Sequence, residues 1–126
     1  MQVNARALVT VVDDDESLRR SVENLLSSVG MEVATLASAE AFLTSSSLDE
    51  TRCLVLDLRM EGMSGLELVA RLAALGKPIP FILLTAHGDQ DVRQQALKAG
   101  AIAFLTKPFR ADDLVNALRT VLGPGP

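Results

Sequence analysis

Cys53-Leu54-Val55-Leu56-Asp57 is the stretch that decides the fold, because an unbroken apolar run ends abruptly in one carboxylate. A continuous apolar run is typical of a strand that is covered on both faces, as in a parallel sheet. We therefore predict a buried strand over residues 52–56 that carries Asp57 to the surface at its carboxyl end. Residues 58–65 then turn the chain toward a helix.

Three other apolar runs have the same form, with polar residues directly after the last apolar one. They are 7–12 followed by Asp13, Asp14 and Asp15, 81–84 followed by Thr85, and 101–105 followed by Thr106, Lys107 and Pro108. We interpret each run as a strand and add a shorter strand over residues 31–36. If the strands are parallel, these polar residues meet at one edge of the sheet.

Between the strands, apolar residues recur at intervals of three and four, which is the spacing of a helix that packs one face on a core. Two of the predicted faces are Leu66, Val69, Leu72 and Leu75, and the thinner set Val92, Ala96, Leu97 and Ala99. The expected helix caps are Asp14 or Asp15, Ser38, and Asp89. The thin apolar set predicts a weakly anchored helix over residues 89–99.

Strand and helix therefore alternate five times, which predicts an α/β fold with a parallel sheet and helices on both faces. Five strands are too few for an eight-stranded barrel. An open, doubly wound sheet remains, and its functional site is expected outside the carboxyl ends of the strands.

Composition limits the possible functions of the 126-residue chain. The net charge of -4 argues against a surface that binds nucleic acid directly. Cys53 is the only cysteine, so we interpret it as a small core residue in a reducing compartment. No apolar stretch approaches the roughly 20 residues of a membrane helix, and no signal-peptide pattern is present. We expect a soluble, cytoplasmic domain.

The polar strand ends predict a cation site. Asp13, Asp14 and Asp57 would repel one another at close range, and a hard divalent cation such as Mg²⁺ relieves that repulsion. Lys107 supplies a positive charge for a phosphate, and Thr85 supplies a hydroxyl donor. Together these groups are suited to the transfer of a phosphoryl group onto Asp57.

Other chemistries lack their motifs in this sequence. Neither a G-x-x-x-x-G-K-[ST] loop nor a G-x-G-x-x-G stretch is present, so nucleotide binding is unsupported. His87 is the only histidine and Cys53 the only thiol, so the sequence gives no support for a zinc site. His87 is either an exposed loop residue or part of the rim of the acidic site.

The same residues resemble the receiver domain of bacterial two-component response regulators of the FixJ/NarL type, over 7–122. The motifs that carry the resemblance are Val11-Val12-Asp13-Asp14-Asp15, Leu56-Asp57-Leu58-Arg59-Met60, Met63-Ser64-Gly65-Leu66-Glu67, Leu84-Thr85-Ala86-His87-Gly88-Asp89, Ala96-Leu97-Lys98-Ala99-Gly100-Ala101 and Phe104-Leu105-Thr106-Lys107-Pro108-Phe109. It implies a flavodoxin-like (CheY-like) five-stranded sheet in the order 2-1-3-4-5. It also implies a receiver domain over 1–122, with 123–126 as a tail or the start of a linker.

The resemblance implies a role for each matched position. Asp57 would be the phosphoacceptor, with Lys107 and Thr85 contacting the phosphoryl group. Mg²⁺ would be bound by the side chains of Asp14 and Asp57 and by the backbone carbonyl of Arg59, and Asp13 would act through a metal-bound water. Thr85 and Phe104 would form the switch, and the peptide bond before Pro108 would be cis.

The implied partners are a cognate sensor histidine kinase and a second copy of the chain after phosphorylation. DNA would be reached only through an output domain that this chain does not contain. The chain would not be a free-standing enzyme, although it would catalyse its own phosphorylation and dephosphorylation.

Two departures from the family pattern concern the site. Glu61 stands where relatives commonly have proline, and Ala103 stands where many have aspartate. Two alternatives stay open. A magnesium-dependent aspartyl-nucleophile phosphatase would need an acid at the position of Arg59, and a pseudo-receiver would dimerise without phosphorylation.

Overall fold

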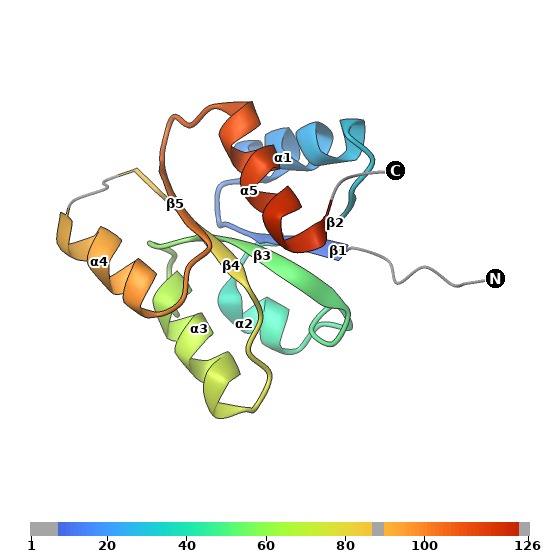
Figure 1. Cartoon of the computed structure of the whole chain (residues 1–126). Helices are drawn as coiled ribbons and strands as arrows, with labels where there is room; N and C mark the ends of the chain where they lie inside the picture. The colour runs from blue at the N-terminus through green and yellow to red at the C-terminus, as the bar shows by residue number, and fades with distance from the viewer. Residues whose placement is uncertain (1–7, 87–89, 124–126) are drawn as a thin grey trace.

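Strands and helices alternate in the computed structural model, which describes residues 8–86 and 90–123 (Figure 1). The elements are β1 (Leu8–Val12), α1 (Glu16–Ser28), β2 (Glu32–Leu36), α2 (Ala39–Leu43), β3 (Thr51–Asp57), α3 (Gly65–Ala74), β4 (Phe81–Thr85), α4 (Gln90–Lys98), β5 (Ala103–Thr106) and α5 (Ala111–Leu122). The predicted alternation of strand and helix is confirmed.

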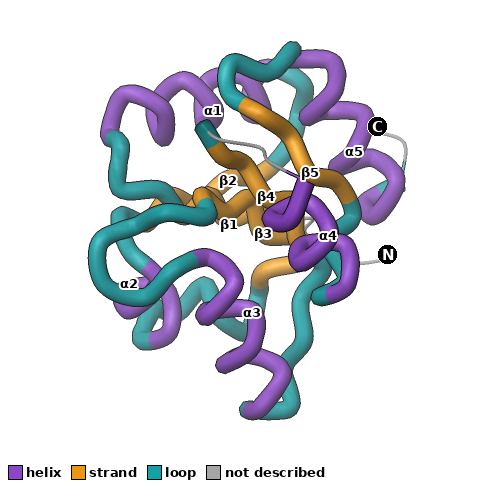
Figure 2. Tube along the Cα trace, turned by 90° about the vertical axis from the view of Figure 1, so that its left-hand side faces the viewer, coloured by secondary structure: helices purple, strands orange, loops and turns teal. Residues whose placement is uncertain are grey.

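The five strands form one parallel sheet in the order β2-β1-β3-β4-β5. Helices α1 and α5 cover one face, while α2, α3 and α4 cover the other, so the sheet is the middle of three layers (Figures 1 and 2). The predicted doubly wound, flavodoxin-like fold is therefore confirmed. The chain leaves β1 toward β2 on one side and later returns to β3 on the other, which creates a switch point between β1 and β3.

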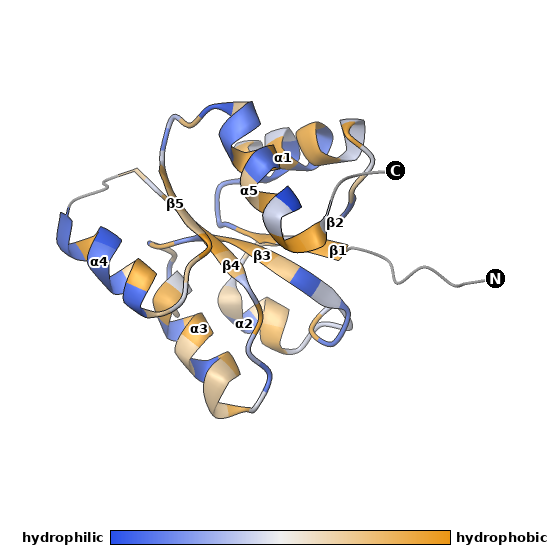
Figure 3. Ribbon diagram, viewed as in Figure 1, coloured by the Kyte–Doolittle hydropathy of each residue, from blue (hydrophilic) through white to orange (hydrophobic). Residues whose placement is uncertain are grey.

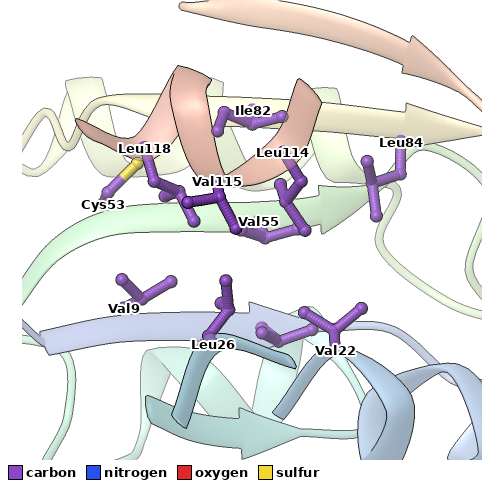
Figure 4. Packing of buried hydrophobic residues seen from close by; sticks show 11 residues of the cluster. Val9, Val22, Leu26, Cys53, Val55, Ile82, Leu84, Leu114, Val115 and Leu118 are labelled. Atoms are coloured by element: carbon purple, nitrogen blue, oxygen red, sulfur yellow. The ribbon is translucent and has the colours of Figure 1, made fainter. Parts of the chain in front are cut away.

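The buried side chains of the sheet divide between two apolar clusters, one beneath each helical layer. Successive residues of a strand point to opposite faces. In β3, Cys53 and Val55 thus belong to the cluster under α1 and α5, whereas Leu54 and Leu56 belong to the cluster under α2, α3 and α4. Figure 4 shows the first cluster, and Figure 3 shows mostly apolar strands between helices of which α3, α4 and α5 carry both polar and apolar residues. Cys53 is fully buried, as predicted.

Two predicted strands begin later in the structure than expected, because their first residues complete the end of the preceding helix. The amide of Met31 donates to Leu26 O and that of Ala101 donates to Ala96 O, each at the 6→1 spacing of a Schellman motif. The glycine before each has a positive φ, +86° at Gly30 and +98° at Gly100, which a side chain would oppose. The strands consequently start at Glu32 and Ala103.

The predicted apolar faces of two helices need correction. Leu75 lies after the last residue of α3 and is 53 % exposed, whereas Leu68, which the predicted face left out, is fully buried. In α4, Leu97 is 49 % exposed, and Ala96 is the buried side chain of the helix. Periodicity identified the helices, but the exact angle at which each helix meets the sheet decided which residues are covered.

Two of the expected helix caps are present. The side chain of Asp15 accepts the amides of Ser17 and Leu18 at the start of α1. The hydroxyl of Ser38 accepts the amide of Ala41 at the start of α2. The third expected cap, Asp89, lies outside the described residues. Within the described ranges, no helix is long and apolar enough to span a membrane.

The difference between Leu68 and Leu75 gives a test of the packing. We expect Leu68→Ala to lower the free energy of unfolding by about 2–5 kcal/mol, because it opens a cavity in a closed cluster. Leu75→Ala removes the same atoms from an exposed position and should change the free energy of unfolding by less than about 0.5 kcal/mol. Urea unfolding followed by circular dichroism measures both, and equal losses would contradict this packing.

Candidate functional site

The register of the sheet brings the polar strand ends to one edge. Val12 of β1 pairs with Leu56 of β3, so the next residues, Asp13 and Asp57, emerge side by side at the switch point. On the other side of β3, Asp57 pairs with Leu84, which places Thr85 one residue further along β4. Neighbouring parallel strands therefore deliver two carboxylates and a hydroxyl from segments that are far apart in sequence.

Three carboxylates converge at this edge. Asp13, Asp14 and Asp57 each offer an oxygen, and these oxygens lie within 4.8 Å of one another. Asp13 is 1 % exposed and Asp57 is 8 % exposed, whereas Asp14 is open to solvent. The structure thus brings together the three side chains that the sequence placed in a cation site.

Lys107 lies against the two buried carboxylates. Its Nζ is 3.1 Å from Asp13 Oδ2 and 3.6 Å from Asp57 Oδ2, and 23 % of its side chain is exposed. The backbone of Lys107 is held in place as well, because its amide donates to Thr85 O at 2.7 Å. The peptide bond between Lys107 and Pro108 is cis, as the resemblance implied.

The pKa of Asp57 is raised above the ordinary value of 3.8. Burial is the largest cause, because it withdraws water from the charged form, and the negative charge of Asp13 adds to it. The positive charge of Lys107 acts in the opposite direction without cancelling the rise. The ionised form of Asp57 is therefore destabilised within the folded chain.

Backbone amides orient all three carboxylates. Asp13 Oδ1 accepts the amide of Asp15 at 2.9 Å, and Asp57 Oδ1 accepts the amide of Arg59 at 3.3 Å. Asp14 Oδ2 accepts the amide of Glu61 at 3.4 Å. A proline at position 61 would have no amide hydrogen to donate. Glu61, which replaces the proline of the family pattern, therefore makes a contact with Asp14 that proline could not make.

The two expected switch residues lie on neighbouring strands. Thr85 ends β4 and is 1 % exposed. Phe104 of β5 pairs with Leu83 of β4. Its half-buried side chain packs on the cluster beneath α2, α3 and α4. Ala103 pairs with Ile82 and faces the cluster beneath α1 and α5, so its side chain is part of the packing. His87 lies outside the described residues.

Sequence reasoning assigned no role to three residues that support the site. Arg19 of α1 donates through Nη1 to the carbonyl of Asp13 at 2.7 Å. A Cβ at Gly65 would lie 2.5 Å from the carbonyl oxygen of Asp57, so only glycine lets α3 approach this closely. Glu40 of α2 accepts the amide of Met63.

A local signal was present for only one neighbouring feature. Ser64 and Glu67 form a capping box at the start of α3, which the spacing S-x-x-E announces. The contacts of Arg19, Glu40 and Gly65 join different elements, and no local pattern encodes them.

The arrangement has the chemistry of a site for a hard divalent cation. Its donors are carboxylate oxygens, which Mg²⁺ prefers, and one of the three carboxylates is open to solvent. Two of them are buried, and among residues 8–86 and 90–123 Lys107 is the cation that pairs with them, which leaves an excess of negative charge. A divalent cation would neutralise that excess.

Comparison with known proteins identifies the family. The model of the response regulator receiver domain matches residues 9–119. Nodulation protein W of Bradyrhizobium diazoefficiens is 47 % identical over 117 residues, which cover 93 % of this chain and 52 % of that protein. The transcriptional regulatory protein FixJ of Azorhizobium caulinodans is 43 % identical over 115 residues, covering 91 % of this chain and 54 % of FixJ.

Solved structures agree. The response regulator StyR superposes with a TM-score of 0.86 at 47 % identity, covering 94 % of this chain and 60 % of StyR. The chain therefore belongs to the receiver domain family of two-component response regulators. It spans about half the length of the curated relatives it matches.

The raised pKa of Asp57 predicts how stability depends on pH without metal. The folded chain holds this proton more tightly than the unfolded chain, so stability is lost as pH rises from about 4 through the raised pKa. Asp57→Asn removes the destabilised charge. We expect the variant to be more stable than wild type at about pH 7, and the gap to close toward about pH 4.

Urea unfolding in EDTA over this pH range measures the free energy of unfolding of both proteins. The titration of the other acids is common to both, so it cancels in the difference. A variant that is less stable than wild type at neutral pH would contradict the assignment of an electrostatic cost to Asp57.

Proposed function

We propose that the chain takes a phosphoryl group from a histidine kinase onto Asp57. The observation that carries the proposal is the placement of Lys107, whose ammonium lies 3.1 Å and 3.6 Å from the two buried carboxylates of Asp13 and Asp57. An ammonium held at this point can neutralise the negative charge of a phosphoryl group bound to Asp57. The match to the receiver family supports the same conclusion.

In the proposed reaction, an oxygen of Asp57 attacks the phosphorus of a phosphohistidine. The new O–P bond forms as the N–P bond breaks, and the donor nitrogen keeps the electron pair of that bond. Lys107 neutralises charge on the transferred oxygens, and preorganised charge of this kind is the main way that proteins accelerate phosphoryl transfer. The burial of Asp57 restricts water around the reacting carboxylate.

Mg²⁺ is the proposed cofactor. The side chains of Asp14 and Asp57 and the backbone carbonyl of Arg59 would hold it, with Asp13 acting through a bound water. When bound, the ion supplies charge neutralisation that lets a phosphate approach three carboxylates. The amide contacts to Asp57 and Asp14 from residues 59 and 61 keep these groups oriented in its absence.

The site also serves for removal of the phosphoryl group by water, so the domain would control its own phosphorylated state without acting on an outside substrate. Thr85 would turn toward the phosphoryl group, and Phe104 would follow into the space. The face formed by α4, β5 and α5 would then change shape. The single buried side chain of α4 supports a helix that shifts at low cost.

The expected partners follow from the family. A sensor histidine kinase would be the donor, and the changed face would control dimerisation or an output domain, and DNA would be contacted only through that output domain. The relative FixJ is a transcriptional regulatory protein about twice as long as the matched region.

We assign residues 1–122 to the receiver and 123–126 to a tail or linker start, and we place the domain in the cytoplasm.

Intact mass spectrometry after incubation with Mg²⁺ and acetyl phosphate tests the proposal. Wild type should gain the mass of one phosphoryl group, and Asp57→Asn should gain none. A gain in both proteins would place the acceptor elsewhere. No gain in either, together with no binding of Mg²⁺ in a titration, would support a pseudo-receiver and overturn the proposal.

Lys107 gives a second test. Lys107→Met keeps much of the side-chain volume but removes the charge, and we expect phosphorylation to slow by about 100-fold or more. Lys98→Met, on the outer part of α4, is the matched control and should react like wild type. The initial rate of the mass gain measures both, and equal rates for all three proteins would remove Lys107 from the mechanism.

A further inference from the structure

The loop that joins β3 to α3 contacts two of the three clustered carboxylates through its backbone. Its ends are fixed, because the amide of Leu58 donates to Leu84 O at 3.0 Å and the amide of Gly65 donates to Leu58 O at 3.1 Å. Between them, the amides of Arg59 and Glu61 contact Asp57 and Asp14. The path of this loop therefore influences where both carboxylates point.

Glu40 holds the loop from a different element. It lies in the first turn of α2, and its Oε2 accepts the amide of Met63 at 2.9 Å across a separation of 23 residues. The pKa of Glu40 is lowered because its own backbone amide and that of Met63 both donate to the carboxylate. One ionised side chain thus connects the start of α2 to the loop.

The loop is shaped to receive this carboxylate. Gly62 precedes the bonded amide and has a φ of +83°, a conformation that side chains disfavour. A Cβ at this position would lie 2.7 Å from Glu40 Oε2, so the end of the Glu40 side chain would have to move away. The absence of a side chain at position 62 is what lets the carboxylate reach the amide of Met63.

We propose that Glu40 is a positioning residue for the cation site: it fixes the segment from Glu61 to Met63, whose Glu61 amide contacts Asp14, and so keeps Asp14 oriented for the ion. The inference rests on the proposed function of the site. Groups that orient metal ligands typically contribute about 10- to 100-fold to metal affinity. Glu40 acts at a distance, since it contacts the loop and none of the three carboxylates.

A purely structural role is the competing explanation. Met60 is buried, and Met63 packs on the same apolar cluster, so these side chains also anchor the loop. If they suffice, Glu40 is only an acidic residue that stabilises the start of a helix. The two explanations differ in their effect on Mg²⁺ affinity, and not in their effect on stability.

The experiment compares wild type with Glu40→Ala and Glu40→Gln. Glu50→Gln is the control, because Glu50 lies just before β3, at the end of that strand opposite Asp57, and loses the same charge. Calorimetric titration with Mg²⁺ gives the Kd, and hydrogen exchange in EDTA reports on the amide of Met63. Urea unfolding verifies that every variant is folded under the conditions of the titration.

We expect Glu40→Ala to raise the Kd for Mg²⁺ by about tenfold and to speed exchange at Met63. Glu40→Gln keeps an acceptor oxygen and should recover part of the affinity, while Glu50→Gln should match wild type. At saturating Mg²⁺, the phosphorylation rate of Glu40→Ala should approach that of wild type, because the defect is in binding the ion.

Gly62→Ala disturbs the contact between Glu40 and the amide of Met63 by a change in the loop. It should weaken Mg²⁺ binding in a protein that retains Glu40, and the double variant with Glu40→Ala should be no worse than the poorer single variant. An unchanged Kd in both Glu40 variants of a chain that binds Mg²⁺ and is phosphorylated overturns this inference alone. A wild-type chain that does neither overturns the proposed function, and the inference with it.

Discussion

The contact of Lys107 with Asp13 and Asp57 is the interaction on which the site depends. Lys107 and Asp13 are 94 positions apart, and the contact exists only because β1, β3, β4 and β5 are held in one register. The amide of Lys107 continues that register beyond β5 by donating to Thr85 O. A slip of one residue would exchange the side chains of a strand between the two apolar clusters, so the packing that fixes the register also fixes the ammonium beside the carboxylates.

The same arrangement is costly for the folded chain. Burial and the neighbouring charge of Asp13 raise the pKa of Asp57, and a single lysine does not remove the excess charge. Groups with perturbed pKa values concentrate at functional sites, because the conditions that make a group reactive also make it unfavourable in the resting state. The apolar clusters on both faces of the sheet supply the stability against which this local cost is set.

The loop after Asp57 connects this electrostatic centre to the rest of the α2–α3 layer. Backbone amides at positions 59 and 61 contact the carboxylates, the side chain of Met60 is buried below, and Glu40 binds from α2. Glu61 has particular interest here, because its amide is a donor that proline cannot provide. The orientation of Asp14 in this chain thus involves a contact that is closed to relatives with proline at this position.

The sequence by itself determined the order of the elements, the parallel sheet and the strand ends that carry Asp13, Asp57, Thr85 and Lys107. These features depend on patterns within a few residues, such as an unbroken apolar run, a helical spacing or a cap. Tertiary structure decided that Leu68 is buried and Leu75 exposed. It also decided that the amides of Met31 and Ala101 bond to the ends of the preceding helices and do not start strands. It also decided the contacts of Arg19, Glu40 and Gly65 around the site. Each of these depends on how one element lies against another, and the free energy of that packing is shared among residues that are distant in the chain.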